Sequence, residues 1–90
     1  MNEAVKDFIK ENIDLINNND WEKVLSSLAF ITFNLKNEIV DVFLKSGVNF
    51  LDDVEHISTH AFSFCRCIEK IELPDTIKDI GNRAFSIAIT

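Results

Sequence analysis

Apolar residues recur at the 3.6-residue spacing of an amphipathic helix in three stretches of the first half of the chain. This spacing predicts helices over residues 3–17, 21–33 and 35–46. The side chains expected to face the core are Val5, Phe8, Ile9, Ile13, Ile16, Trp21, Val24, Leu25, Leu28, Ile31, Leu35, Ile39, Val40 and Phe43. We expect these helices to pack against the segment that follows them.

The residues at the ends of the three stretches support these boundaries. Asn2 and Asp20 are suitable N-caps, because their side chains can accept hydrogen bonds from unpaired backbone amides. Gly47 is suited to the left-handed conformation that commonly ends a helix. Phe30 and Phe33 lie off the apolar stripe of the second helix, so we expect them to pack against a different neighbour.

The second half of the chain repeats itself at an interval of 23 residues. The segment ISTHAFSFC at 57–65 aligns with IGNRAFSIA at 80–88, with Ile, Ala, Phe and Ser recurring identically. A fixed period of this size is typical of a solenoid, in which each unit buries its apolar face against its neighbour. We expect Phe62 and Phe85, one period apart, to stack on each other in the core.

Two short apolar segments, 48–51 and 71–74, are also one period apart. Their alternating pattern predicts short strands that pair in parallel. Residues 61–62 and 84–85 are expected in short helical turns. A third strand would lie beyond Thr90. Unless residues 86–90 fold back over it, we expect the second strand to be an open edge, and such an edge recruits a partner.

The positions of the second half that follow one spaced pattern are Ile57, Ala61, Phe62, Cys65, Ile68, Ile71, Leu73, Pro74, Ile77, Ile80, Gly81, Ala84 and Phe85. Residues 54–90 thereby resemble the BspA-type leucine-rich repeat, also called the Treponema-type or LRR-5 repeat. Two positions depart from its pattern, since Ser58 replaces a glycine and Ala88 replaces a cysteine. The resemblance implies a binding surface and no shared catalytic residues.

These patterns together predict an α+β protein with a single domain over residues 1–90. Residues 1–47 are expected to form an N-terminal three-helix cap. This cap is expected to pack on a short, truncated leucine-rich-repeat solenoid over residues 48–90, with a small parallel sheet. The cap is needed because fewer than two repeats are present, and such repeats bury their apolar faces only against neighbours.

Composition and charge narrow the classes of partner. The chain has 90 residues, of which 47% are hydrophobic and 27% charged, as in ordinary globular proteins. Residues 1–55 hold eleven Asp and Glu against five Lys and Arg, a net charge of −6, while residues 56–90 hold four of each sign. This charge disfavours direct binding to nucleic acid or anionic membranes. We see no secretory signal or membrane-spanning run, so we expect a cytoplasmic location.

One group of residues has the types that bind zinc: His56, His60, Cys65 and Cys67. Their spacing is not a standard one, and Cys65 is explained as a buried repeat position. A Cys–His nucleophilic pair also needs an orienting group and an oxyanion site, which nothing in the sequence indicates. Cys65 and Cys67 are too close for an unstrained disulfide. We therefore predict no metal, no cofactor and no enzyme activity.

The candidate binding residues form an acidic row and two single positions. The row, at helical spacing on the polar side of the first predicted helix, is Glu3, Asp7, Glu11 and Asp14. It is interpreted either as a solvated face or as a negative surface that binds a basic protein. Phe64 takes a repeat position that is usually polar, so it is a candidate interface anchor. Glu72, expected to point outward from the second strand, is also a candidate.

The function predicted from these features is a non-enzymatic protein–protein interaction module. A concrete version is a small acidic inhibitor of a host protein, carried by a phage or mobile element and similar to an anti-CRISPR. The alternative is a self-associating structural or adaptor subunit that forms a homodimer through the open repeat end. A metal-dependent protein that uses the His and Cys group is the third possibility.

Overall fold

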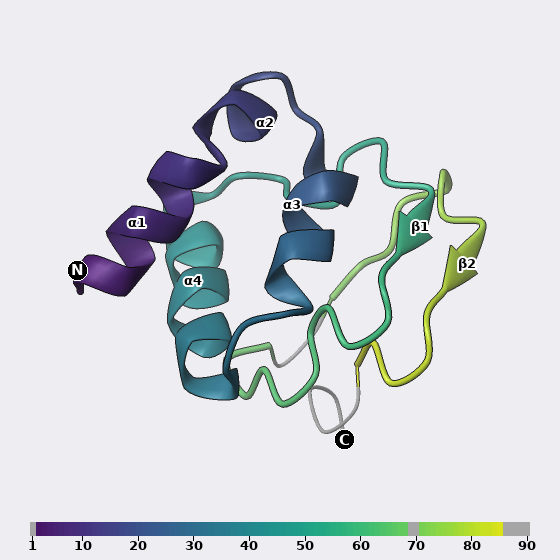
Figure 1. Cartoon of the computed structure of the whole chain (residues 1–90). Coiled ribbons are helices and arrows are strands. Elements are labelled where there is room, and N and C mark those ends of the chain that lie inside the picture. The colour runs from purple at the N-terminus through teal and green to yellow at the C-terminus, as the bar shows by residue number, and fades with distance from the viewer. Residues whose placement is uncertain (1, 69–70, 86–90) are drawn as a thin grey trace.

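The computed structural model describes residues 2–68 and 71–85, and these combine four helices with a small parallel sheet (Figure 1). The elements in chain order are α1 (Glu3–Glu11), α2 (Ile13–Asn17), α3 (Trp21–Leu28), α4 (Phe33–Ser46), β1 (His56–Ile57) and β2 (Asp79–Ile80). The helices occupy one side of the molecule, and the strands with their connecting turns occupy the other. The α+β class is therefore confirmed. Ala88 and the rest of the alignment after Phe85 lie outside the described residues.

The predicted first helix is interrupted at Asn12. Asn2 is the N-cap as expected, and its side-chain oxygen accepts a hydrogen bond from the Val5 amide (3.0 Å). The buried Asn12 side chain donates to the Phe8 carbonyl (2.8 Å), and this side-chain bond to the backbone accompanies the break between α1 and α2. Beyond the break, Ile13 is exposed, so its predicted core position is wrong.

The second predicted helix ends earlier than expected, at Leu28. Its last turn is tightened by backbone bonds of the i→i+3 type, including Phe30 N–H to the Ser27 carbonyl (3.2 Å), and α4 then begins at Phe33. Asp20 precedes α3 without making a side-chain cap bond. Gly47 closes α4 in the left-handed conformation, as predicted, with φ of 76°.

Phe30 and Phe33, which lie off the apolar stripe of the second predicted helix, were both expected to pack against another neighbour, and this prediction holds for only one of them. Phe33 packs against Phe64, with ring centroids 4.2 Å apart, so the expectation of a different neighbour is confirmed. The same expectation is wrong for Phe30, whose side chain is 90% exposed. The early end of α3 places Phe30 in the turn before α4, where its ring points away from the core.

The strands predicted at 48–51 and 71–74 are not formed. Instead, residues 48–51 turn, with Asp52 N–H bonded to the Asn49 carbonyl (3.0 Å), and this turn buries Phe50 and Leu51 in the shared core. Residues 71–74 have no regular structure, so the expected open strand edge is absent there. The strands that do pair lie later in the chain than the predicted ones, at His56–Ile57 and Asp79–Ile80.

Strands β1 and β2 pair in parallel with a register of 23 residues, since His56 faces Asp79 and Ile57 faces Ile80. Backbone bonds continue the pairing on both sides, including Gly81 N–H to the Ile57 carbonyl (2.7 Å). The same offset extends into successive tight turns, rather than helical turns, after each strand. The period read from the sequence therefore matches the spatial repeat.

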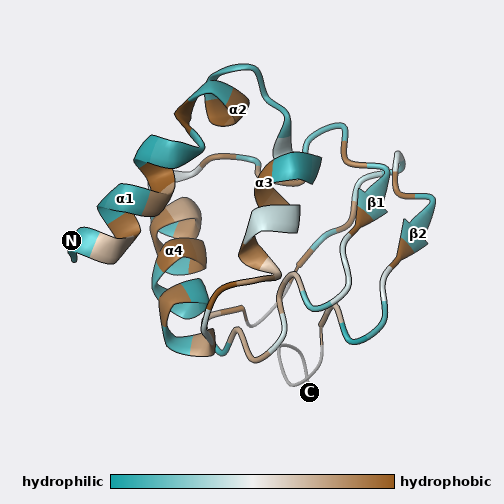
Figure 2. Ribbon diagram, viewed as in Figure 1, coloured by the Kyte–Doolittle hydropathy of each residue, from teal (hydrophilic) through white to brown (hydrophobic). Residues whose placement is uncertain are grey.

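Aromatic rings connect the helices to both repeats. Centroid distances are 5.5 Å for Trp21–Phe43, 6.0 Å for Phe43–Phe50, 5.8 Å for Phe50–Phe62 and 5.2 Å for Phe62–Phe85. The last pair is stacked, with an interplanar angle of 14°, so the predicted stacking of Phe62 on Phe85 is confirmed. Figure 2 shows that hydrophobic and hydrophilic residues alternate along the helices, and the buried hydrophobic residues of the helices and of both repeats form one core cluster.

Lys36 on α4 is a charged residue inside this core, with only 1% of its surface exposed. Its ammonium group donates to the His60 carbonyl (2.5 Å) and lies 5.7 Å from the centroid of the Phe33 ring. Burial lowers the pKa of Lys36, an effect opposed by the nearby Cys65 thiol. The lysine thus fastens α4 to the turn that follows β1.

Gly81 and Ser58 occupy equivalent places in the two repeats but have different surroundings. A Cβ atom on Gly81 would lie 2.7 Å from the Thr59 Cα atom of the first repeat, which is too close for two carbon atoms. Ser58 instead faces α3, where its hydroxyl is 2.8 Å from that of Ser26. A glycine is therefore required at this position only where a preceding repeat lies against it.

We predict that Gly81→Ala lowers the free energy of unfolding by about 1–3 kcal/mol, because the new methyl group overpacks the contact between the repeats. Ser58→Ala, at the equivalent place, removes only one hydroxyl contact and is expected to cost about 0.5–1.5 kcal/mol. Urea unfolding of both variants measures the difference. A Gly81→Ala protein as stable as the parent protein would contradict the stacked arrangement.

Candidate functional site

The acidic row is exposed throughout. Glu3, Asp7 and Glu11 lie on α1, and Asp14 lies beyond the break, on α2. None of the four forms an ion pair with a cation in the part of the chain that the structure describes. Their exposure fits both a solvated face and a binding face, so the binding role stays a prediction.

Phe64 lies half-buried where the turn after β1 meets the start of α4. Its backbone is left-handed (φ 62°), and its ring packs on Phe33, which is 50% exposed. Asn37 on α4 fixes this turn, because its amide donates to the Phe64 carbonyl (2.6 Å) and its oxygen accepts from the Cys67 amide (3.3 Å). The fold therefore holds the Phe64 backbone in place and leaves the rings of Phe64 and Phe33 partly exposed to solvent.

A depression of about 370 Å³ lies beside these rings. Its lining residues are Phe33, Asn34, Asn37, Phe64 and Arg66, and we call this set the Phe64 surface. Its chemistry is aromatic with one exposed cation and amide groups, a combination common at protein interfaces. The sequence indicated Phe64 alone, because the contact with α4 joins residues about thirty positions apart.

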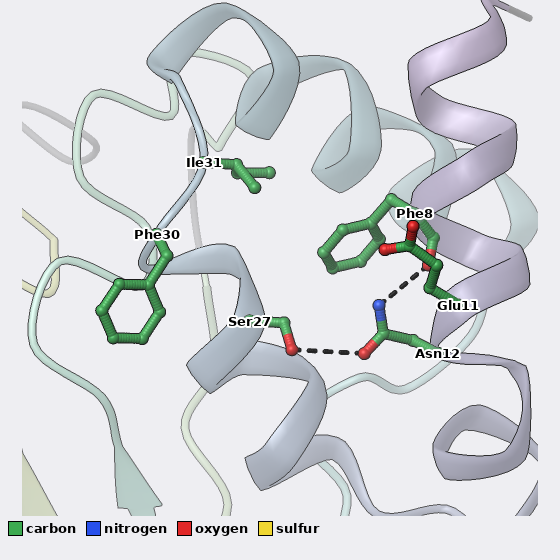
Figure 3. A pocket seen from close by; sticks show the side chains of 6 residues that line it. All are labelled: Phe8, Glu11, Asn12, Ser27, Phe30 and Ile31. Atoms are coloured by element: carbon green, nitrogen blue, oxygen red, sulfur yellow. Dashed lines mark hydrogen bonds between the residues drawn. The ribbon is translucent and has the colours of Figure 1, made fainter.

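A second depression, of about 440 Å³, lies between α1 and the end of α3 (Figure 3). Its lining residues are Phe8, Glu11, Asn12, Ser27, Phe30 and Ile31, and we call this set the α1–α3 pocket. Figure 3 shows the Phe30 ring at one side and the Glu11 carboxylate at the other. Of these residues, only Glu11 was a candidate from the sequence.

The residues that suggested a metal site do not converge. His56 and His60 are exposed, whereas Cys65 is fully buried. Within residues 2–68 and 71–85, no three or more His, Cys, Asp or Glu side chains are grouped as a metal site requires. His60 contributes its backbone to the core, through the bond from Lys36, and not its imidazole.

The two thiols are held in their protonated form. Burial raises the pKa of Cys65 to about 12, with a smaller contribution in the same direction from the neighbouring Cys67 and an opposing one from the Lys36 ammonium group. Burial also raises the pKa of Cys67, whose thiol donates to the Asn37 carbonyl (3.6 Å). Because the thiolate is the nucleophile, neither cysteine is activated for attack at neutral pH.

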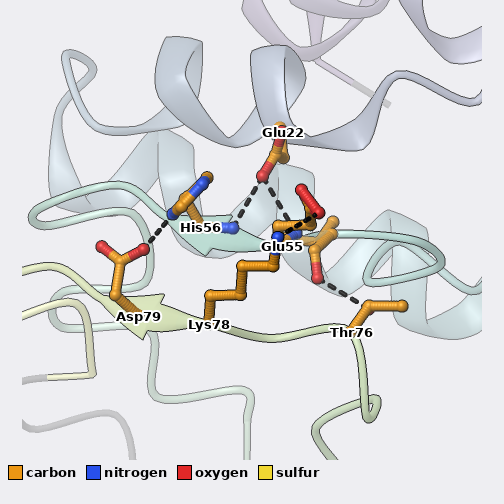
Figure 4. A network of polar contacts seen from close by, with 7 residues as sticks. Glu22, Glu55, His56, Thr76, Lys78 and Asp79 are labelled. Atoms are coloured by element: carbon orange, nitrogen blue, oxygen red, sulfur yellow. Dashed lines mark hydrogen bonds and ion pairs between the residues drawn. The ribbon is translucent and has the colours of Figure 1, made fainter.

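A polar network joins α3 to both strands (Figure 4). The Glu22 carboxylate on α3 accepts from the backbone amides of Glu55 (2.9 Å) and His56 (2.6 Å), and Lys78 pairs with Glu55 (3.1 Å). His56 pairs with Asp79, directly across the two strands. The network satisfies backbone donors at the edge of β1 that faces the helices, so its role in the fold is structural.

The two repeats differ in how well their apolar residues are covered. Ile57 is 1% exposed, whereas its equivalent Ile80 is 46% exposed. Leu73 and Glu72 are also exposed on the second repeat. The structure therefore places Glu72 at the surface, as expected, but on an irregular segment and not on a strand.

Comparison with known proteins identifies one family. The family model described as BspA type leucine rich repeat region, which has six copies of the repeat, matches residues 43–89. Neither the curated proteins nor the solved structures gave a match. No helix among the described residues combines the length and hydropathy that crossing a bilayer requires.

The His56–Asp79 pair predicts a pH dependence of stability. The hydrogen bond to Asp79, opposed by partial desolvation and supported by the charges of Asp79, Glu22 and Glu55, raises the pKa of His56 above 6.5. A raised pKa in the folded state stabilises the protein below the unfolded pKa. This contribution is lost as the pH rises through the folded value. Because the pair is exposed, we expect a small effect.

A double-mutant cycle of His56→Asn and Asp79→Asn, followed by urea unfolding, measures this coupling at several pH values. We expect favourable coupling at about pH 6, below the unfolded pKa of histidine, that declines as the pH is raised to about 9. Coupling that stays constant across this range would show that the histidine charge is not involved.

Proposed function

The chain belongs to the BspA-type leucine-rich repeat family, and on this basis we propose that it is a non-enzymatic module that binds another protein. Repeats of this general kind stack into extended surfaces that bind partners. The protonated state of both thiols agrees with this proposal, because it leaves them without nucleophilic activation.

The observation that supports this function most directly is the Phe64 surface. Two aromatic rings remain partly exposed at a place where the backbone is fixed by hydrogen bonds from Asn37. Rigid, partly exposed aromatic residues beside an arginine are typical of the residues that dominate binding energy. We propose that Phe64 is the anchor of this interface and that Phe33 and Arg66 extend it.

We further propose that residues 1–47 act as a cap for the repeats in 48–90. Three contacts support this division within one domain. Glu22 accepts from the β1 backbone, Ser26 pairs with Ser58, and Lys36 donates to the His60 carbonyl. Glu22 and Ser26 take the places on the first repeat that the first repeat itself takes on the second, where Glu55 accepts from the Lys78 and Asp79 amides and Thr59 lies against Gly81.

A narrower version of the proposal is an acidic inhibitor of a host protein, carried by a phage or mobile element and similar to an anti-CRISPR. The size of 90 residues and the net charge of −6 support it, and they also disfavour direct nucleic-acid binding. The cytoplasmic location expected from the sequence stays a prediction.

Photo-crosslinking can test the Phe64 surface before the partner is identified. We predict that p-benzoylphenylalanine in place of Phe64 forms a discrete covalent adduct with one protein in the native cells. The matched control places the same amino acid at the exposed Leu44, near the other end of α4. The proposal is wrong if position 64 gives no discrete adduct, or the same adducts as position 44.

Once the partner is identified, Phe64→Asn tests whether the Phe64 ring contributes to binding, because Asn tolerates the left-handed backbone that Phe64 adopts. We expect a loss of affinity of about tenfold or more with little change in melting temperature. An unchanged affinity would remove Phe64 from the interface.

Self-association is a second candidate function, and the exposure of Ile80 supports it. The equivalent Ile57 is covered, so the second repeat leaves open an apolar surface that a second copy could cover across a two-fold axis. This interface would involve the second repeat around β2, in place of the strand edge expected at 71–74.

Analytical ultracentrifugation tests this alternative. If the second repeat mediates a homodimer, the protein sediments as a dimer at tens of micromolar, and Ile80→Lys sediments as a monomer because it places a charge in the interface. A wild-type protein that stays monomeric over the whole concentration range excludes this function and leaves the first proposal standing.

A further inference from the structure

The α1–α3 pocket places one large exposed aromatic side chain beside a surface depression. Phe30 is 90% exposed, and the adjacent depression has a volume of about 440 Å³. Phe8 and Ile31, which belong to or pack on the core, line it together with Phe30 (Figure 3). A volume of this size accepts a bulky apolar group.

Two of the three polar side chains that line the pocket, Asn12 and Ser27, are already hydrogen-bonded within the protein. The Asn12 amide donates to the Phe8 carbonyl (2.8 Å), and its oxygen accepts from the Ser27 hydroxyl (3.2 Å). Glu11 makes no ion pair with another residue in the described part of the chain. The features offered to a ligand are therefore an apolar surface and one carboxylate at its edge.

The charge around the pocket determines which partner fits. Glu11 belongs to the acidic row of α1, which is diluted by Lys6 and Lys10, and residues 1–55 have a net charge of −6. Two copies of this surface would repel each other, whereas a basic segment would be attracted. Charge complementarity thus favours a cationic partner over a second copy.

We propose that the α1–α3 pocket binds a basic amphipathic segment of another protein. A bulky apolar side chain of that segment packs between Phe8, Phe30 and Ile31, and a neighbouring Lys or Arg pairs with Glu11. This site lies apart from the Phe64 surface. It shares with the proposed function only the premise that the chain binds a protein.

Heteronuclear NMR with designed peptides tests the site directly. The probe is a short amphipathic peptide of Leu and Lys, compared with a Leu/Glu peptide of the same pattern and a Ser/Lys peptide of the same charge. We expect the Leu/Lys peptide to shift the amide signals of Phe8, Ser27 and Ile31, and the other two to leave them unchanged. Higher salt weakens the interaction because the ion pair is at the surface.

Matched variants separate this pocket from other surfaces. Phe30→Ser and Glu11→Gln should each weaken the Leu/Lys peptide, with about a tenfold loss for Phe30→Ser. Phe33→Ser, on the Phe64 surface, and Asp75→Asn, in the turn before β2, should not. Because Phe30 and Glu11 are exposed, we expect their variants to keep the melting temperature of the parent protein.

Three outcomes would overturn the proposal. They are equal binding of the Leu/Glu peptide, signal shifts confined to the Phe64 surface, and equal weakening by the control variants. The first two would leave the crosslinking test at Phe64 unaffected, so a failure here is distinguishable from a failure of the proposed function.

Discussion

Contact between aromatic rings joins the two halves of this chain, and the other features of the fold depend on it. Trp21 and Phe43 belong to the helices, Phe50 to the turn after them, and Phe62 and Phe85 to successive repeats. Each adjacent pair of such rings contributes about 0.5–1.5 kcal/mol beyond the area it buries. In a chain of 90 residues, where repeats cannot bury their own apolar faces, these contacts supply the missing neighbour.

The sequence predicted which positions are equivalent, but not which of them pair. Buried repeat positions such as Phe62 and Phe85 reveal the period because both need the same environment. The segment 48–51 has the same apolar pattern as a strand, yet it turns after Gly47 and buries Phe50 against the helices. Local alternation cannot distinguish these outcomes, since both bury the same side chains. Lys36 was missed because a buried lysine requires a carbonyl that only tertiary structure supplies.

The candidate site was predictable only in part, for a similar reason. Phe64 could be singled out because it is apolar at a usually polar position, whereas its neighbours come from α4. Phe30 lies off the apolar stripe of a helix that was predicted to continue to residue 33, so it was expected to pack on another neighbour, whereas the early end of α3 leaves it exposed. Exposed acidic residues were recognised from spacing alone, but a depression between two helices depends on their placement in space.

Backbone handedness repeats in this molecule even where chemistry does not. His60 and Arg83 are 23 positions apart, differ in side chain and are both exposed, yet both are left-handed, with φ of 63° and 56°. The stacked turns require a left-handed backbone at this position, and more than one side chain that tolerates this conformation can occupy it. Successive turns therefore present exposed side chains at matching places on the surface, where substitution by another residue that tolerates a left-handed backbone changes the surface chemistry and keeps the backbone path.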